Sequence, residues 1–578
     1  MVEFHVSPVG QDSNDGSSAA PFATVARAQQ AVRECLATGA DDDLAVLLAD
    51  GRHELADTLT FDFRDSAPAG RSVTYAAAEN AAPVLSGGRR ITGWRVGEDG
   101  LWRTTLPDVA RGGWYFRQLF VNGQRATRAR TPNAGEYRHL VAAEFEGDYD
   151  EHKLWFEPGQ LAAWRNVRDV EAVMYSHWVV TRKRLLEVDL EHNVARTQGP
   201  HFVGIQRPGA KAPFYFENAL EFLDQPGEWY LDRDTGELTY MPRPGEDPQT
   251  AEVVAPYLTT LARIAGTIHQ PVRGLNFRGL GFEHAAWHMP PEGHRPIQAG
   301  FVFPPPPPEH KWNKGPWFAD FACVPVSAAV CWEYAHGCSL EDCRVAHTGA
   351  TGVHLREGCR DAVLAGNELV DTGCNGILVG EYWRCPYEHN REEDILPGMV
   401  PTRIRIERNH VHHCAAQLED GVGIAYTFAA GVTVARNHIH DLPYTGISAG
   451  FIWILKRTCC EGNVIERNHI HDVMLRMADG GGIYTLGRQP GSVLRKNLIH
   501  DIPRHPKAIG APNNGIFMDE ASCEFLLEGN VVYGSAGTPV RHNENLPYWQ
   551  TWRDNTFCEE GRPDPATLDA CEAGIGKK

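Results

Sequence analysis

One short motif decides the fold: Arg436-Asn437-His438-Ile439-His440-Asp441 returns unchanged at Arg467-Asn468-His469-Ile470-His471-Asp472. Variants stand at residues 408–412, 496–501 and 529–533, so that successive asparagines lie 28, 31, 29 and 33 residues apart. Shorter copies at residues 366–370 and 554–557 extend the series at both ends. A period of this length is typical of stacked supersecondary units.

The repeated unit is made of strands. It contains short β-branched runs such as Ile404-Arg405-Ile406 and Val432-Thr433-Val434, interrupted by Gly and Asn. The regular leucines of a leucine-rich repeat are absent. We therefore predict an all-β fold, a right-handed parallel β-helix with about three short strands per coil and ~4.8 Å between coils.

The recurrent asparagine has a physical role in such a coil. Asn tolerates a left-handed turn, and its amide can hydrogen-bond to the Asn of the neighbouring coil. The Val or Ile that follows it would point into the core. We expect one internal column of side chains, formed by Asn409, Asn437, Asn468, Asn497 and Asn530.

The chain divides into three predicted parts. Residues 1–88 form the opening coils and an N-terminal cap, with a short helix from Pro21 to Leu36 over the core. Residues 89–255 lack the Asn pattern and are rich in Trp and turns, which predicts antiparallel hairpins and an inserted β-sandwich-like domain. Residues 256–578 form the main β-helix.

Composition limits the partners. The 578-residue chain carries 55 Lys and Arg against 74 Asp and Glu, a net charge of −19. Such a field repels nucleic acid and anionic membrane surfaces, so neither is an expected partner. Aromatic residues make up 10% of the chain and include 15 Trp, which suits a protein that stacks flat apolar faces such as those of sugar rings. The oligomeric state stays open.

The compartment follows from what the sequence lacks. The start, Met1-Val2-Glu3-Phe4-His5-Val6, has neither the basic nor the apolar region of a signal peptide. The 14 Cys show no regular disulfide spacing, and Cys459 and Cys460 are adjacent. We expect mostly free thiols and a cytoplasmic location.

Several motifs carry a family resemblance. The runs Leu119-Phe120-Val121-Asn122-Gly123-Gln124-Arg125, Pro226-Gly227-Glu228-Trp229-Tyr230-Leu231 and Asp479-Gly480-Gly481-Gly482-Ile483-Tyr484 resemble those of β-helix glycoside hydrolases. The chain is most similar to family 141, whose activities include α-L-fucosidase and xylanase, and more distantly to family 120, which contains β-xylosidases. This resemblance implies a β-helix with an inserted β-domain and a carbohydrate cleft between them.

Glycoside hydrolysis needs two carboxyls that flank the scissile bond. Asp479 precedes three glycines, which would let a ligand approach the backbone closely, and Asp519 lies one coil later. Their separation of 40 residues resembles that of the acid pair in family 141. We predict Asp479 and Asp519 as the catalytic pair, without deciding which is the general acid. Glu520 is the alternative to Asp519, and Asp420, in an equivalent place in an earlier coil, is predicted to bind a substrate hydroxyl.

A column of histidines shares one register. His412, His440, His471 and His500 each lie three residues after an Asn, and three of them precede an Asp. A metal needs convergent nitrogens rather than a ladder, and a His–Asp pair satisfies itself, so we expect neither a metal nor another cofactor. His440 is retained as a residue that reaches the sugar.

Aromatic residues near the acids are predicted to stack on the sugar. These candidates are Trp453, Tyr484 and Tyr426. From the inserted domain, His177 and Trp178 with Arg182 are predicted to overhang the cleft.

Three functions from different classes compete. The preferred one is a glycosidase that cleaves neutral oligosaccharides and resembles fucosidases or xylosidases and xylanases. A polysaccharide lyase would need Lys, Arg or a cation to neutralise a uronate, which the acidic balance disfavours. A non-catalytic carbohydrate-binding β-helix, such as a spike, would need a trimerisation segment, and none is evident. The sugar, linkage, anomer and stereochemical outcome stay open.

Overall fold

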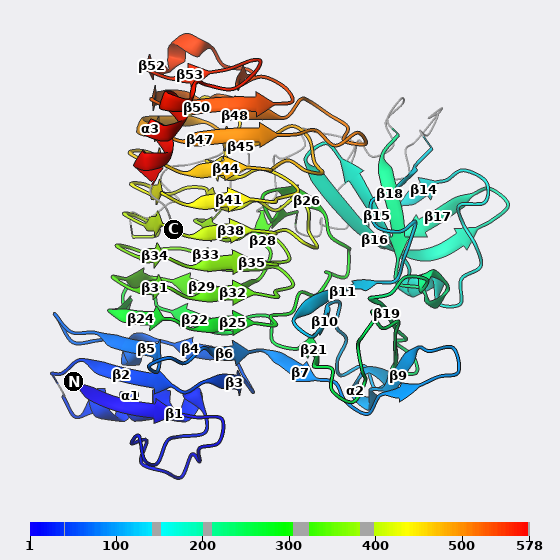
Figure 1. Ribbon diagram of the computed structural model, residues 1–578, viewed down its shortest axis with the longest axis horizontal. Helices are drawn as coiled ribbons and strands as arrows, with labels where there is room; N and C mark the ends of the chain where they lie inside the picture. The colour runs from blue at the N-terminus through cyan, green and yellow to red at the C-terminus, as the bar shows by residue number, and fades with distance from the viewer. Residues whose placement is uncertain (40, 142–151, 200–210, 304–322, 382–397, 576–578) are drawn as a thin grey trace.

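The computed structural model describes residues 1–39, 41–141, 152–199, 211–303, 323–381 and 398–575. A column of stacked coils carries an inserted domain at its side (Figure 1). Three parallel sheets wrap the column, and we call them the first, second and third faces. The first face has 12 strands, from β1 (Val2–Val6) to β52 (Thr551–Arg553). The second face has 11 strands, from β3 (Gly51–Glu54) to β53 (Thr556–Phe557). The third face has 10 strands, from β4 (Leu59–Phe61) to β51 (Val540–His542). The predicted parallel β-helix is confirmed.

Each coil contributes one strand to each face in turn. The four coils that matter below are formed by β37 (Arg405–Glu407), β38 (His410–His412) and β39 (Ile424–Tyr426); β40 (Thr433–Ala435), β41 (His438–His440) and β42 (Ile447–Ala449); β43 (Val464–Glu466), β44 (His469–His471) and β45 (Gly481–Thr485); and β46 (Arg488–Arg495), β47 (Leu498–Ile502) and β48 (Asn514–Met518). β49 (Cys523–Glu528) and β50 (Val531–Ser535) lead to β51. Side chains at the same level in successive coils stack, as Ile439, Ile470 and Ile499 do in the core.

The predicted asparagine column exists. The Nδ2 of Asn437 donates to Oδ1 of Asn468 at 2.9 Å, and Asn468 donates likewise to Asn497 at 3.0 Å. The same contact links Asn367, Asn409 and Asn437, and Asn497, Asn530 and Asn555. The left-handed residue of each turn is not the Asn but the residue before it, as at Arg436 (φ 56°) and Arg467 (φ 54°). The Asn side chain points inward because it caps backbone groups that the turn leaves without partners.

Helices are few in the described residues. They are α1 (Val25–Ala37), α2 (Pro107–Ala110) and α3 (Pro565–Ile575). α1 closes one end of the column, with Val25, Ala28 and Val32 in the core (Figure 1). It begins later than predicted, because Thr24 is its N-cap: the side chain of this extended residue accepts a hydrogen bond from the Arg27 N–H.

The inserted domain contains two sheets of its own. At its base, β7 (Gly88–Arg90) pairs antiparallel with β21 (Val253–Pro256). The predicted hairpin around Trp229 is formed by β19 (Glu228–Leu231) and β20 (Glu237–Tyr240). The second sheet includes β15 (Glu171–Ser176), β16 (Val179–Asp189) and β18 (Pro213–Glu217), and it lies beside the upper coils in Figure 1. Each sheet packs on a separate apolar core.

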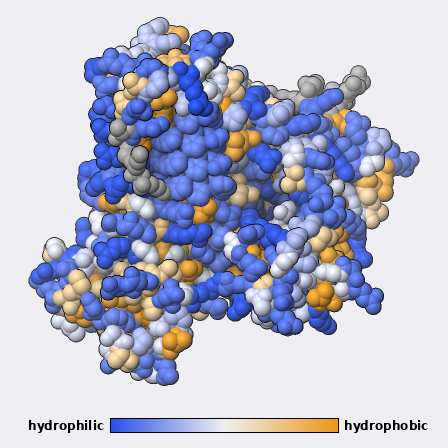
Figure 2. Space-filling model, viewed as in Figure 1, coloured by the Kyte–Doolittle hydropathy of each residue, from blue (hydrophilic) through white to orange (hydrophobic). Residues whose placement is uncertain are grey.

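Polar contacts fasten the inserted domain to the column. Arg125 Nε lies 2.6 Å from Asp371 Oδ1, and Arg182 Nη2 donates to the Gln417 carbonyl at 2.6 Å. The Ala478 N–H donates to the carbonyl of His177 at 3.0 Å. The last contact brings the β15–β16 hairpin next to Asp479. Figure 2 shows the surface hollowed between the column and the inserted domain.

The thiol prediction is confirmed within the described residues. All 13 cysteines there are free, and most are buried. In that same part of the chain, no helix is long and apolar enough to cross a membrane.

Candidate active site

Asp479 and Asp519 flank neighbouring strands of the third face. Asp479 lies two residues before β45, and Asp519 follows β48 directly. The two strands pair in parallel, with Tyr484 level with Phe517. Asp479 has a left-handed backbone (φ 61°), and its N–H donates to the Ala511 carbonyl at 3.2 Å. The turn thereby fixes the Asp479 carboxyl just before the start of β45.

The glycines after Asp479 have a different role from the predicted one. A Cβ at Gly480 would meet Thr445 Oγ1 at 2.5 Å, and one at Gly481 would meet the Asn514 carbonyl oxygen at 2.7 Å. A Cβ at Gly482 would meet Ile499 at 2.5 Å. The three glycines therefore allow β45 to pack against its own and neighbouring coils; they do not bare the backbone to a ligand.

Asp519 is held by hydrogen bonds to both carboxylate oxygens. The hydroxyl of Tyr484 donates to Oδ2 at 2.6 Å, and Asn543 Nδ2 donates to Oδ1 at 2.7 Å. Asn545 fixes the adjacent backbone through the Met518 carbonyl at 2.6 Å. These hydrogen bonds fix the orientation of the Asp519 carboxylate.

The acids of this region share one electrostatic field. Burial, and then the charge of Asp519, raises the pKa of Asp479 to about 6, against the opposing pull of Arg541 and Arg504. Burial, and then the charges of Asp519 and other carboxylates, raises the pKa of Glu520 to about 7. The Nη1 of Arg541 lies 3.5 Å from Oδ1 of Asp479. Near neutral pH this arrangement presents a readily protonated carboxyl beside Asp519.

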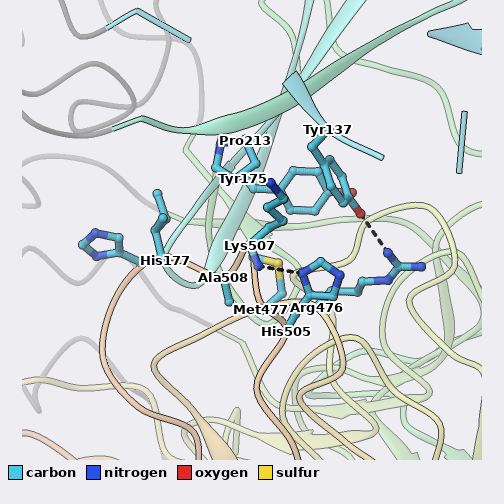
Figure 3. Close-up of a pocket in the computed structure, with 10 residues that line it drawn as sticks. Tyr137, Tyr175, His177, Pro213, Arg476, Met477, His505, Lys507 and Ala508 are labelled. Atoms are coloured by element: carbon cyan, nitrogen blue, oxygen red, sulfur yellow. Dashed lines mark hydrogen bonds between the residues drawn. The ribbon is translucent and has the colours of Figure 1, made fainter. Parts of the chain in front are cut away.

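The inserted domain packs against the loop that precedes Asp479 (Figure 3). A small cavity there lies between the two parts of the chain, and residues from both line it: Tyr137, Tyr175, His177, Pro213, Arg476, Met477, His505, Lys507, Ala508 and Ile509. Arg476 Nη1 donates to the Tyr137 hydroxyl at 2.9 Å. His177 is exposed and borders this cavity; its predicted contact with a sugar held at Asp479 stays a prediction.

Trp453 and Tyr484 lie together outside the coil. Trp453 is half-buried and packs with Tyr484, Leu486 and Phe517. Tyr484 is only 2% exposed, so its ring offers no stacking face, and its role is the hydrogen bond to Asp519. Of the predicted platforms, Trp453 alone keeps an accessible position.

Tyr426 is a core residue, contrary to the predicted platform. Its side chain is 1% exposed, and its hydroxyl donates to Gln489 Oε1 at 3.1 Å. Along the third face, Tyr426 is level with Ala449 and Thr485, whereas Tyr484 is level with Ser448 and Ala425, so the two tyrosines point to opposite sides of the sheet. The sequence interpretation was wrong by one residue in register.

Asp420 lies below the surface. It is 0% exposed, and its Oδ1 lies 3.6 Å from Nε2 of the equally buried His294. The predicted hydrogen bond to a substrate hydroxyl would need an open position, which this carboxyl does not have.

Arg182 and Trp178 fasten the inserted domain rather than overhang the cleft. Arg182 is 3% exposed, and its Nη1 donates to Glu217 Oε1 at 2.8 Å in addition to its bond with the Gln417 carbonyl. Trp178 Nε1 donates to the Ile297 carbonyl at 2.8 Å. Both predictions of direct sugar contact are corrected, because Arg182 is buried and the indole N–H of Trp178 already bonds the column.

His440 stands on the second face, away from the strands that the acids flank. Its Nδ1 bonds Asp441 Oδ2 at 2.6 Å, as expected for a His–Asp pair. This position does not support contact with a sugar held at Asp479.

The sequence interpretation missed Arg541, Asn543 and Tyr444. Tyr444 donates from its hydroxyl to the Asp479 carbonyl at 3.2 Å. Arg541 pairs with Phe517 in register, so it shares the outward face of Tyr484. Its only sequence signal was its place in Val540-Arg541-His542, one coil after Asp519, in the coil that carries the motif variant at residues 529–533.

Comparisons with known proteins agree with this architecture. Residues 99–243 match the family model described as GH141 insertion domain, and residues 327–532 match that described as right handed beta helix region. A solved structure described as a glycoside hydrolase is 25% identical, covers 100% of this chain and 99% of its own, and superposes with a TM-score of 0.86. The structure of XylC with xylose is 14% identical over 93% of this chain and 76% of its own, with a TM-score of 0.51. No curated protein matches the sequence.

The fold and these matches define the chain as a right-handed parallel β-helix glycoside hydrolase, an enzyme that acts on a carbohydrate. Within that class, its inserted domain is of the family 141 type, so the resemblance drawn from the sequence motifs is confirmed.

Proposed function

We propose that the enzyme cleaves a glycosidic bond with Asp479 as general acid and Asp519 as nucleophile or base. The observation that supports this is the contrast between their surroundings. The pKa of Asp479 is raised to about 6, whereas Asp519 accepts hydrogen bonds from Tyr484 and Asn543. Two carboxyls with different environments are what acid–base cleavage of a glycoside requires.

The chemistry assigns each group one task. Asp479 donates its proton to the oxygen of the leaving sugar as the bond to the anomeric carbon breaks. Asp519 either bonds to that carbon or takes a proton from the attacking water. Tyr484 keeps the Asp519 carboxylate aimed, and the nearby Arg541 restores the charge balance when Asp479 has lost its proton.

The substrate class proposed is a neutral oligosaccharide with a terminal or internal fucose or xylose. The family 141 type of the inserted domain supports fucosides and xylosides as the first probes. The half-buried Trp453 beside Tyr484 supplies a ring for the apolar face of a sugar.

The decisive experiment replaces each carboxyl by its amide. On a panel of aryl fucosides and xylosides, Asp479→Asn and Asp519→Asn should each lower kcat by about 10²–10⁴. Asp479→Asn should lose least on substrates with an activated phenol leaving group, which needs no proton. If Asp519 is a nucleophile, added azide should restore turnover to both variants, and the glycosyl azide should have the retained configuration with Asp479→Asn and the inverted configuration with Asp519→Asn. The matched control is Asp472→Asn, in the same coil but on the second face, which should stay near wild type.

If Asp479→Asn keeps near-normal turnover, Asp479 is not the general acid and another group has that role. Glu520 is then the next candidate, because its pKa is raised to about 7. Glu520→Gln measured on the same panel distinguishes the two assignments.

A lyase is the second candidate function, favoured by one observation. Arg476, His505 and Lys507 line the cavity beside the Asp479 loop, where a uronate would need cations. The clustered carboxyls of Asp479, Asp519 and Glu520 would repel that same uronate. Digestion of uronate-containing polysaccharides, followed by ultraviolet absorbance, tests this; unsaturated products would favour the lyase.

A further inference from the structure

The second face carries two columns of imidazoles rather than the single predicted column. His412, His440, His471 and His500 form the predicted column. His410, His438 and His469, two residues earlier on the same strands, form another. All seven side chains point outward and are partly exposed, while the residue between them is buried in the core. Figure 2 shows hydrophilic side chains covering the column over β41 and β44.

The two columns meet diagonally. Nε2 of His410 lies 2.7 Å from Nε2 of His440, and Nε2 of His438 lies 2.8 Å from Nε2 of His471. Within a column, the rings of successive coils are nearly parallel, with His410 and His438 centroids 5.1 Å apart. Nitrogens from adjacent coils therefore converge, which the expectation of a simple ladder did not foresee.

This geometry generates a repeated three-residue group. Each group takes, from one coil, the residue level with the column of His410, His438 and His469, and it takes both histidines from the next coil. Within each group the ligand atoms lie within 4.8 Å of one another, and the groups in the described residues are Glu368, His410 and His412; His410, His438 and His440; and His438, His469 and His471. The series ends one coil later, where Leu498 takes the place of a histidine beside His469.

The imidazoles are prepared as ligands. The Asp441 carboxylate bonds Nδ1 of His440 at 2.6 Å, and Asp472 bonds Nδ1 of His471 at 2.8 Å, so that Nε2 of each is aimed at the opposite column. A carboxylate on the far nitrogen is the usual support of a metal-bound histidine.

We propose that these histidines bind a divalent transition-metal ion of the Zn²⁺ class, which joins neighbouring coils of the second face. The His410–His438–His440 and His438–His469–His471 groups share His438. Because His438 offers one ligand atom, only one of these two groups can hold an ion at a time. Zn²⁺ takes imidazole nitrogens at ~2.0–2.1 Å and a fourth ligand from water. The ion replaces the proton shared between two Nε2 atoms, and that proton passes to solvent.

Calorimetric titration of the untagged, chelator-treated enzyme with Zn²⁺ tests the site. Wild type should bind Zn²⁺, release protons in proportion, and melt at a higher temperature with Zn²⁺ than without it. The double variant His410→Gln/His438→Gln breaks all three groups and should bind at least about 100-fold more weakly. His500→Gln removes an imidazole of the same columns that belongs to none of the three groups, and it should bind like wild type.

Three results would overturn the proposal: wild type that binds no Zn²⁺, a double variant that binds as tightly as wild type, or His500→Gln that loses as much affinity as the double variant. Turnover of the aryl glycosides reports folding independently, because the acids flank strands of the third face. If the double variant does not fold, His438→Gln alone removes both all-histidine groups and gives the same comparison.

Discussion

The hydroxyl of Tyr484 donates a 2.6 Å hydrogen bond to Oδ2 of Asp519, and the two residues come from neighbouring coils. The bond links the outward side of β45 to the carboxyl that ends β48. It also accounts for the burial of a tyrosine that would otherwise suit sugar stacking. Tyr484 is thus a positioning residue for the proposed catalytic pair.

Removal of that hydroxyl should impair turnover more than binding. Tyr484→Phe should lower kcat about 10–100-fold, since a hydrogen bond to a charged group contributes roughly 1.5–3 kcal/mol, while KM changes little. Tyr444→Phe should have a smaller effect, because that hydroxyl donates to the backbone carbonyl of Asp479 and accepts from Gln298 Nε2 but does not contact a carboxylate. Equal kinetics of Tyr484→Phe and wild type would contradict the positioning role.

The raised pKa of Asp479 predicts the alkaline limb of the pH–rate profile. A general acid works only when protonated, so kcat/KM should fall as pH rises through about 6. In Asp479→Asn this limb should disappear from the residual activity. If the alkaline limb is unchanged in Asp479→Asn, another group causes it, and Glu520→Gln is the next variant to measure.

Arg182 should matter for stability rather than chemistry. Arg182→Ala removes one of the partners of the buried Glu217, which keeps Arg128, and leaves the Gln417 carbonyl without this donor. The loss should cost about 1–3 kcal/mol of unfolding free energy in denaturant titration. The control is Arg196→Ala on the inserted domain, whose exposed pair with Glu187 contributes less than about 1 kcal/mol. A stable Arg182→Ala enzyme with lost turnover would restore the cleft-facing role.

Substitution of an asparagine in the middle of the column should lower the free energy of unfolding more than substitution at its end. Asn468→Ala removes the acceptor of two buried donors on Asn437, and each unsatisfied donor costs about 1–3 kcal/mol. Asn555→Ala, at the half-buried end of the column, should cost less, because water can replace the lost partner. Comparable denaturation midpoints for the two variants would refute the column as a major source of stability.

The low pKa of His469 should make the fold sensitive to acid. Its pKa is about 3 when folded, against an ordinary value of 6.5, so the unfolded chain binds the proton more tightly. Its contribution to stability is complete above about pH 6.5 and is lost as pH falls toward about 3. With a chelator present, His469→Leu should show a weaker fall of stability between these limits; an identical pH dependence would contradict this.

Much of the molecule follows from the sequence alone. The spacing of Asn409, Asn437, Asn468 and Asn497 sets the coil length, and the β-branched runs set the strands, so the β-helix and its column were predictable. Both are local properties repeated along the chain: a strand has a side-chain period of two, and a turn has its own residue preferences. The positions of Asp479 and Asp519 beside consecutive strands follow from the same repeat.

Only the tertiary structure decided which side chains share the site. Tyr426 and Tyr484 end similar Gly-Ile motifs, yet one lies in the core and the other faces outward, because a shift of one residue along a strand reverses the side. The contact of Arg541 with Asp479 depends on the stacking of coils, and the burial of Arg182 depends on how the inserted domain docks. The meeting of His410 with His440 likewise needs two coils in register. Such contacts join residues far apart in sequence, and no local pattern encodes the distances between them.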